Sequence, residues 1–239
     1  MIEYCAKMAM ISQLAYLNKD EANPRFKAMG YTYHRFYDCN GAQCHIAWNK
    51  EEFVIAFRGT EPKEFSDIKA DLNIWPDEEQ TNGLVHNGFQ NELDKLWKDV
   101  EKSVSKIKKQ ELFICGHSLG AAMATIAACR LQDKVEALYT YGSPRVGNRH
   151  FVNSINVAHY RHVNNNDVVP SIPWAILGYR HHGTLRYLDY HGNVTNMSTW
   201  QRIKDKIKGR LRAFEKKVPF DGFYDHSIDQ YCRYLKGER

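Results

Sequence analysis

A serine lies between two glycines in residues 116–120, which read Gly-His-Ser-Leu-Gly, the pattern G-x-S-x-G. The apolar run 112–115 before the pattern is typical of a buried strand, and the alanine-rich residues 121–131 after it are typical of a helix. A sharp turn between strand and helix lifts the serine hydroxyl clear of the sheet, and glycine gives the room that this turn needs on both sides. The context therefore indicates that Ser118 is a nucleophile.

A serine hydroxyl becomes a good nucleophile when a histidine takes its proton and an acid orients that histidine. In hydrolases with this turn, the acid and then the histidine follow the serine along the chain. Asp167 comes directly after the predicted strand 157–163, at the sheet edge where such folds place their sites, but spacing leaves Asp189 and Asp221 open as alternatives. The histidines that follow Asp167 are His181, His182, His191 and His226.

Hydrophobic periodicity predicts the elements that hold these residues. Apolar positions at helical spacing predict helices over 2–17 and 89–108, in addition to 121–131. The run 53–57 is continuously apolar, as expected of a strand covered on both faces. Further strands are predicted over 112–115, 137–141 and 157–163. Because strands and helices alternate through the middle of the chain, we predict an α/β fold with a mostly parallel central sheet flanked by helices.

Composition excludes several classes of protein. Hydrophobic residues make up 43% and charged residues 26% of the 239 residues, which is typical of a folded chain and not of a disordered one. No segment has a linker composition, so we predict a single domain over residues 1–239. No run approaches the roughly 20 apolar residues of a transmembrane span. The N-terminus lacks the features of a signal peptide, so we expect a cytoplasmic protein or one exported by a signal-peptide-independent route.

The six cysteines form no CxxC pair, which argues against a zinc ribbon or a redox motif. Cys39 and Cys44 flank Asn40-Gly41, a turn signal between the predicted hairpin strands 31–38 and 43–49. The two thiols could pair across a four-residue loop, so the sequence leaves this disulfide open.

Several polar residues near these motifs are interpreted as structural. Adjacent side chains diverge, so His181 and His182 are interpreted as a solvated pair and not as metal ligands. His117 is expected to point away from the nucleophile, and His86 to pack and hydrogen-bond at a loop. Arg145 is expected to hold a tight turn. No metal site is predicted.

Six motifs occur in one order: FVIAFRGT (53–60), VHNGF (85–89), CGHSLGAA (115–122), YGSPRVGN (141–148), RHVNNNDVVP (161–170) and DHSIDQY (225–231). Together they resemble the class 3 lipase family, the fungal-type triacylglycerol lipases and feruloyl esterases. The resemblance spans most of the chain and is strongest over 53–232. It implies an α/β-hydrolase fold in which Ser118 is the nucleophile, Asp167 the orienting acid and His226 the general base.

An oxyanion hole follows from the same chemistry. The tetrahedral intermediate carries its charge on the former carbonyl oxygen, so fixed N–H donors must already point there. One donor is the backbone N–H of Leu119, the residue after the nucleophile. The resemblance implies that the second donor is the backbone N–H of Thr60, the last residue of FVIAFRGT.

The resemblance implies a serine carboxylic ester hydrolase that works through an acyl-enzyme and needs no metal or organic cofactor. Acylglycerols are the preferred substrate class, while soluble esters of the feruloyl type and phospholipids are alternatives. The alternative from a different class is a non-catalytic lipid-binding module, and the complete set of catalytic residue types argues against it. We expect no nucleic-acid partner, because the excess of basic charge is confined to one segment.

A lid over the site is the next feature that the resemblance implies, between Thr60 and the VHNGF motif. Residues 61–75 are the candidate, with Phe65, Ile68 and Leu72 at helical spacing. Five charged residues fill the early part of this segment and leave a narrow apolar face, so the segment is either a functional lid or a fixed polar flap of the esterase kind. We therefore predict weak interfacial activation, and a severalfold jump in rate at the solubility limit of the substrate would contradict this.

The basic segment 202–217 holds eight Lys or Arg and two acids, a local charge of +6 in a chain of net charge +5. Its apolar residues recur at helical spacing and predict an amphipathic helix; they are Ile203, Ile207, Leu211, Phe214 and Val218. We favour the interpretation that this stripe packs on the core and the basic face is solvated. Contact with an anionic lipid surface is the second interpretation, and binding of a nucleic acid or an acidic protein is the third.

Overall fold

A central sheet of eight strands organises the molecule. The computed structural model describes residues 2–60, 76–78, 83–215 and 221–238. In these residues the strand order is β1-β2-β3-β6-β7-β8-β9-β10. The strands are β1 (Tyr33–Cys39), β2 (Ala42–Trp48), β3 (Glu52–Phe57), β6 (Glu111–His117), β7 (Val135–Tyr141), β8 (Ala158–Asn164), β9 (Thr184–Leu188) and β10 (Val194–Thr195). Neighbours from β3 to β9 pair parallel, and the outer strands pair antiparallel. The predicted mostly parallel sheet is confirmed.

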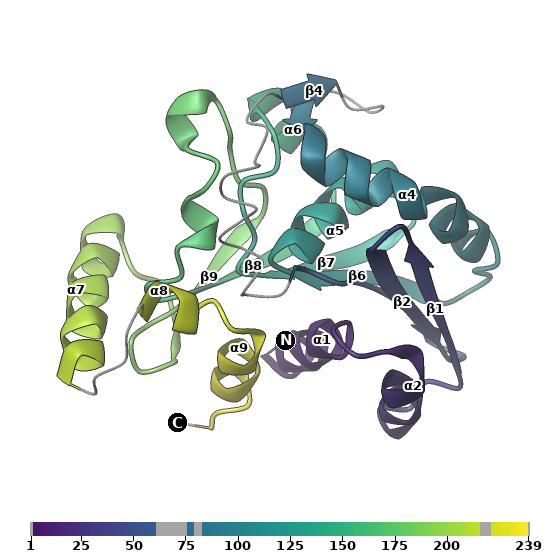
Figure 1. The fold of residues 1–239 in the computed structure, drawn as a ribbon, viewed down its shortest axis with the longest axis horizontal. Coiled ribbons are helices and arrows are strands. Elements are labelled where there is room, and N and C mark those ends of the chain that lie inside the picture. Colours follow the sequence, from purple (N-terminus) through teal and green to yellow (C-terminus); the bar gives the residue numbers. More distant parts are fainter. Residues whose placement is uncertain (1, 61–75, 79–82, 216–220, 239) are drawn as a thin grey trace.

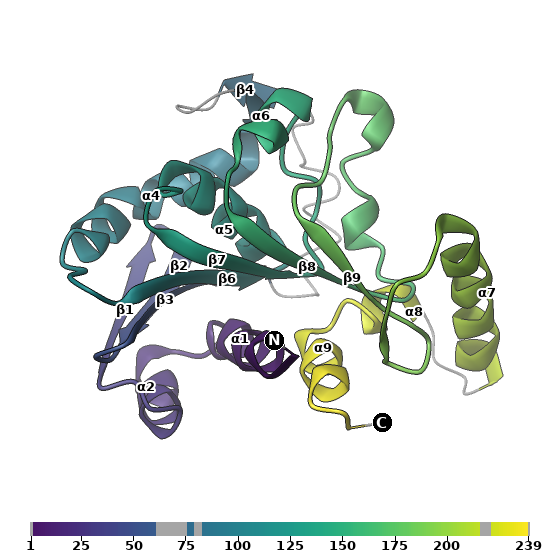
Figure 2. The ribbon, with the colours of Figure 1, turned by 180° about the vertical axis from the view of Figure 1, so that it is seen from behind.

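Helices cover both faces of this sheet, as Figures 1 and 2 show from opposite sides. One face carries α4 (Asn87–Val104), α5 (Leu119–Arg130) and α6 (Arg149–Ser154). The other carries α1 (Ile2–Leu14), α2 (Lys19–Ala28) and α9 (Ile228–Leu235). A small second sheet of β4 (Pro76–Glu78) and β5 (Leu84–His86) lies beside α6. In the described part of the chain, none of the helices combines the length and apolarity that a bilayer crossing requires.

Strand β3 shows why its sequence is continuously apolar. All six of its residues are buried. Phe53, Ile55 and Phe57 belong to the core on the α4–α5 face. Val54 and Ala56 belong to the core on the α1–α9 face. A strand covered on both sides needs apolar residues at every position, so the interpretation of 53–57 is confirmed.

The hairpin between β1 and β2 settles the question of the disulfide. Its turn has two residues, Asn40 and Gly41, both with positive φ. The register therefore sets Cys39 opposite Ala42, and Cys44 opposite Tyr37. Since a four-residue loop is not formed, the two thiols are not partners, and both are free.

The predicted helices are confirmed with shifted ends. The expected helix 2–17 is α1 and ends at Leu14, and the expected helix 89–108 is α4 and spans Asn87–Val104. The helix after the serine motif begins two residues earlier than expected, at Leu119. Ends shift because local caps, and not the apolar stripe, decide where a helix stops.

The favoured interpretation of the basic segment, that its apolar stripe packs on the core, is wrong. It forms α7 (Thr199–Glu215), but the residues that α7 buries are Asp205, Gly209 and Ala213. The described part of the expected stripe, from Ile203 to Phe214, is exposed to solvent. Small residues on the buried face let the helix approach the protein closely, and this contact outweighs the apolar stripe. Val218 lies outside the described residues.

Buried histidines make stability depend on pH. Burial lowers the pKa of His45 to about 3, of His162 to about 3 and of His86 to about 4. These rings are neutral in the folded protein, whereas in the unfolded chain a histidine binds a proton below a pH of about 6.5. The unfolded state therefore takes up protons first, and the free energy of unfolding falls as the pH drops from about 6.5 toward 4.

We expect each of these histidines to cost about 2 kcal/mol of stability at pH 5, because the unfolded chain binds its proton about 1.5 pH units above this pH. Thermal unfolding at pH 7.5 and pH 5 measures the effect, and the melting temperature should be several degrees lower at pH 5. His150→Gln changes an exposed histidine and should leave the difference intact. An equal or higher melting temperature at pH 5 would contradict the prediction.

Candidate active site

Ser118 occupies the turn between β6 and α5. Its backbone has φ 58 and ψ −128, a positive φ that a residue with a side chain adopts only under strain. A side chain at Gly116 would collide with the backbone of Gly120, and one at Gly120 would collide with the backbone at Phe57. The two glycines of the motif therefore let α5 fold back tightly over the end of the sheet, and the turn holds the serine in its strained conformation.

His226 and Asp167 lie in line with this serine. The Nε2 atom of His226 is 2.9 Å from the Ser118 hydroxyl oxygen, and its Nδ1 atom is 3.0 Å from each carboxylate oxygen of Asp167. A carboxylate only accepts hydrogen bonds, so Nδ1–H donates to Asp167 and leaves Nε2 to accept the serine proton. All three side chains are buried. The arrangement can activate a hydroxyl nucleophile.

Asp167 is held from two further directions. The Tyr231 hydroxyl donates to one carboxylate oxygen at 2.6 Å, and the backbone N–H of Val169 donates to the other at 2.9 Å. Burial, and then the charge of Asp167, raise the pKa of Tyr231 well above its usual value, so this hydroxyl keeps its proton and remains a donor. The carboxylate thus faces His226 in one orientation. Tyr231 was not predicted, since it lies 64 residues from Asp167 in sequence.

Gly142 also contacts the pair, and no local motif in the sequence marks it. A Cβ atom at this position would lie 2.7 Å from Oδ2 of Asp167 and 2.8 Å from Nδ1 of His226. Its φ of +57 adds a backbone penalty for any larger residue. Glycine at 142 therefore gives the acid and the base room to approach each other.

We expect Gly142→Ala to lower kcat on the order of 10²-fold, because displacing catalytic groups by about 1 Å has this effect. The matched control is Gly41→Ala, a glycine with φ +84 in the β1–β2 turn that has no atom within 4 Å of an added Cβ. It carries the same backbone penalty without the contact and should retain wild-type kcat. Initial rates on p-nitrophenyl butyrate compare the two, and equal rates would refute the role of Gly142.

His117 packs directly on the ring of His226, with ring centroids 4.5 Å apart. Its Nε2–H donates to the backbone carbonyl of His226 at 2.6 Å, and its Nδ1 accepts from the Tyr16 hydroxyl at 2.7 Å. Burial, and then the neighbouring His226, lower the pKa of His117 well below its usual value, so the ring stays neutral. His117 is structural, as expected, but its contact with the base makes it a positioning residue.

The two expected oxyanion donors belong to segments that adjoin Ser118. Leu119 is the first residue of α5, where a backbone N–H has no partner within the helix. A Cβ atom at Gly59 would be 3.2 Å from the Ser118 Cβ atom, so the chain that leads into Thr60 lies against the nucleophile. The Thr60 hydroxyl is buried and has no hydrogen-bond partner within the described ranges. The assignment of the backbone N–H groups of Leu119 and Thr60 as oxyanion donors stays a prediction.

Comparison with known proteins decides the family. A family model described as lipase (class 3) matches residues 54–176, which is more than half of the chain. The chain belongs to the class 3 lipase family. The α/β-hydrolase fold described above agrees with this membership.

The curated relatives extend well beyond the part that matches this chain. It is 34% identical to toxin TseL of Vibrio cholerae over 247 residues, which covers 84% of this chain and 36% of that protein. It is 39% identical to secreted mono- and diacylglycerol lipase 1 of Fusarium solani over 114 residues, 44% of this chain and 34% of that protein. The chain thus spans about a third of each of these relatives. Its fold matches lipase II from Rhizopus niveus with a TM-score of 0.73 and 20% sequence identity. The match covers 97% of this chain and 96% of the Rhizopus chain.

Asp189, His181 and His182 lie outside the line of hydrogen bonds from Ser118 to Asp167. Asp189 accepts backbone N–H groups of His191 and Asn193, and closes the turn between β9 and β10. His181 bonds the carbonyl of Pro170, and His182 meets the ring of His159. The interpretation as a solvated pair is therefore wrong, because each of the two rings is partly buried against a polar partner.

The remaining predictions around the class 3 lipase site have mixed outcomes. Arg145 donates to the carbonyls of Ser171 and Pro173, which confirms its structural role. His86 stacks on Phe89, but both of its ring nitrogens lack a hydrogen-bond partner in the described residues. The candidate lid 61–75, with Phe65, Ile68 and Leu72, lies outside the described residues, so weak interfacial activation stays a prediction.

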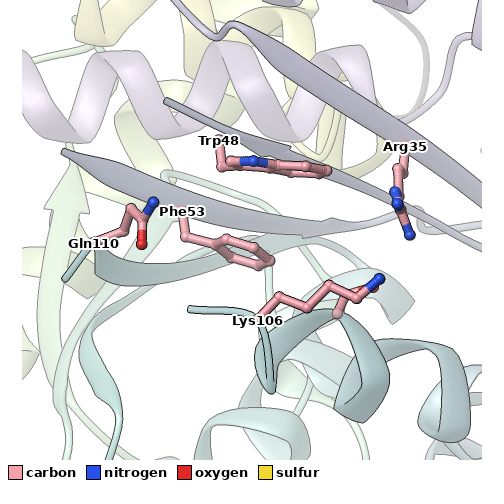
Figure 3. A pocket seen from close by; sticks show the side chains of 6 residues that line it. Arg35, Trp48, Phe53, Lys106 and Gln110 are labelled. Carbon is pink, nitrogen blue, oxygen red and sulfur yellow. The ribbon is translucent and has the colours of Figure 1, made fainter. Parts of the chain in front are cut away.

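Two cavities lie away from the serine hydroxyl. One of about 310 Å³ opens between the end of α1 and the start of α9, beside His117. The other, of about 190 Å³, lies between strands β1 to β3 and the C-terminal end of α4. Figure 3 shows Trp48 and Phe53 in this second cavity, with Arg35 and Lys106 at one end. Since no triad residue lines it, the second cavity is not part of the active site.

Proposed function

We propose that this class 3 lipase hydrolyses acylglycerol esters through an acyl-enzyme formed on Ser118. The observation that carries the proposal is the continuous line of hydrogen bonds from Ser118 through His226 to Asp167. The names of its relatives support the substrate class, because one of them is a mono- and diacylglycerol lipase.

The chemistry proceeds in two halves. His226 takes the Ser118 proton at Nε2 as the serine oxygen attacks the ester carbon, and Asp167 stabilises the imidazolium that forms. The backbone N–H groups of Leu119 and Thr60 bind the oxyanion. His226 then protonates the departing alcohol, which leaves the acyl group on Ser118. A water molecule, activated by the same histidine, releases the carboxylic acid and restores the serine.

Access to the site forms part of the proposal. Ser118 is fully buried, so the residues that cover it move before an ester reaches the hydroxyl. Acylglycerols with long chains collect at lipid surfaces, and the proposal therefore includes peripheral contact with such a surface through residues 202–217.

Hydrolysis rates across substrates test this function. Emulsified mono-, di- and triacylglycerols are compared with p-nitrophenyl butyrate, ethyl ferulate and phosphatidylcholine, with acid release followed by titration. We expect the highest specific activity on an acylglycerol. Preference for ethyl ferulate would indicate a soluble-ester esterase, preference for phosphatidylcholine a phospholipase, and no turnover of any ester would overturn the proposal.

A further inference from the structure

Helix α7 presents an apolar face to solvent. Its residues Trp200, Ile203, Ile207, Leu211 and Phe214 follow helical spacing, and all five are exposed. Their exposed fractions run from 44% at Ile203 to 85% at Phe214. Figures 1 and 2 show α7 at the rim of the molecule, apart from the helices that cover the sheet. Large apolar side chains gathered on one exposed face mark an interaction site.

The opposite side of α7 is firmly attached to the protein. Asp205 accepts hydrogen bonds from the Asn165 amide at 2.6 Å, the Tyr187 hydroxyl at 3.0 Å and the Tyr190 backbone N–H at 3.2 Å. The side chain of Gly209 is only a hydrogen, which lets the helix touch Asn165. With 3.6 residues per turn, the centre of the apolar stripe lies roughly 160° from the centre of the buried face. The stripe therefore points straight away from the protein.

Basic residues flank the apolar stripe on both sides. Helical geometry places Lys204 and Lys208 along one border and Arg210 along the other, and all three are exposed. Among the described residues, no carboxylate forms an ion pair with any of these three. The acid in the middle of the helix, Asp205, points inward to its three donors. Glu215, also exposed, falls on the border of Lys204 and Lys208 at the end of the helix. The outer face is thus apolar along its centre and has a net positive charge along its edges.

We propose that α7 binds an anionic lipid bilayer, lying in its surface with the stripe from Trp200 to Phe214 inserted among the acyl chains. The basic borders match the negative headgroups, and the apolar centre matches the boundary below them. A nucleic acid offers charge but no place for the apolar residues, so it fits this face less well. This inference rests on the proposed function, because a lipid hydrolase gains from residence at the surface that holds its substrate.

Attachment of α7 links this contact to the active site. Asn165 bonds Asp205, and the Asn166 amide donates to the Lys206 carbonyl at 3.1 Å. The next residue along the chain is Asp167. The helix that meets the bilayer is therefore fixed to the turn that carries the acid, so docking holds the triad at a set height above the lipid.

Vesicle binding tests the proposal. The protein is prepared as Ser118→Ala, so that no lipid is consumed, and cosedimented with vesicles of phosphatidylcholine alone or mixed with phosphatidylglycerol. We expect stronger binding to the anionic vesicles and its loss at high salt. Adding Leu211→Ser and Phe214→Ser should weaken binding about tenfold or more, because both large apolar side chains are lost. Lys204→Glu with Lys208→Glu should abolish the preference for anionic lipid.

A matched control, the melting temperature and the oligomeric state in solution keep the outcomes separate. Tyr33→Ser removes an exposed aromatic residue on β1, at the opposite edge of the sheet, and should bind vesicles as the parent does. Melting temperatures show whether each variant is folded. Equal binding to neutral and anionic vesicles, or unchanged binding after the Leu211 and Phe214 substitutions, would overturn the proposal. A dimer that dissociates when Leu211 and Phe214 are replaced would also overturn the proposal, because the face would then be a contact between copies of the chain.

The test also separates this inference from the proposed function. Strong anionic binding by the Ser118→Ala protein, together with no ester turnover by the wild type, would leave the docking face standing and overturn the hydrolase. Ester turnover by the wild type without α7-dependent vesicle binding would support the hydrolase and overturn the docking face.

Discussion

Replacing Ser118 with alanine should lower kcat on p-nitrophenyl butyrate by about 10⁶-fold. The substitution removes the oxygen that attacks the ester, and loss of the nucleophile in a serine triad has an effect of this size. Binding of the ester should persist, because the donors at Leu119 and Thr60 remain in place. Initial rates with active-site concentration determined on the wild type measure the effect.

Folding of the Ser118→Ala protein is the necessary control. Alanine also carries a Cβ at the strained φ of 58, so the melting temperature should stay close to that of the wild type. A folded Ser118→Ala protein with more than a hundredth of the wild-type rate would mean that another group attacks the ester.

Asp167→Asn should lower kcat by about 10⁴-fold with little change in KM. An asparagine amide can donate toward Nδ1 of His226, which favours the tautomer that carries its proton on Nε2 and cannot accept the serine proton. The amide keeps the size of the carboxylate, so the loss reports on proton transfer and not on packing.

The matched control for the acid is Asp189→Asn. Sequence spacing leaves Asp189 as an alternative acid, but its carboxylate binds the β9–β10 turn. We expect Asp189→Asn to keep wild-type kcat, with some loss of thermal stability. If instead Asp189→Asn were inactive and Asp167→Asn active, the acid would be assigned to the wrong residue.

Most of the fold could be predicted from local patterns. The apolar run of β3 and the helical stripe of α4 each reflect burial of a whole element, and burial leaves a strong periodic signal. Ser118 can be predicted as the nucleophile because a tight strand–turn–helix connection restricts the residue types over five consecutive positions. The single domain over residues 1–239 stays a prediction.

The partners of Ser118 were harder to predict from spacing. Asp167 and His226 are 59 residues apart in sequence, and several other residues of the same types follow the serine. Spacing could not choose among them, and the resemblance to the class 3 lipases supplied the choice. Tyr231 and Gly142 escaped notice because their roles arise from contacts that the fold creates, with no local motif to mark them.

Helix α7 shows where periodicity fails. The stripe of large apolar residues was correctly recognised as one face of a helix, but its direction was predicted wrongly. Asp205 finds three donors on the protein side, and Gly209 permits a close approach that a larger residue would prevent. A buried carboxylate with three donors cannot be told from a solvated one in the sequence, so the pattern alone could not show which face packs.

Covalent trapping of the nucleophile tests the central claim most directly. The wild type is incubated with a hexyl p-nitrophenyl phosphonate, which forms a stable adduct with an activated serine, and the modified peptide is located by mass spectrometry. We predict one equivalent of released p-nitrophenol, parallel loss of esterase activity and a single adduct on Ser118, formed far more slowly in Asp167→Asn. An adduct on a different residue, or full activity after Ser118 is modified, would contradict the account.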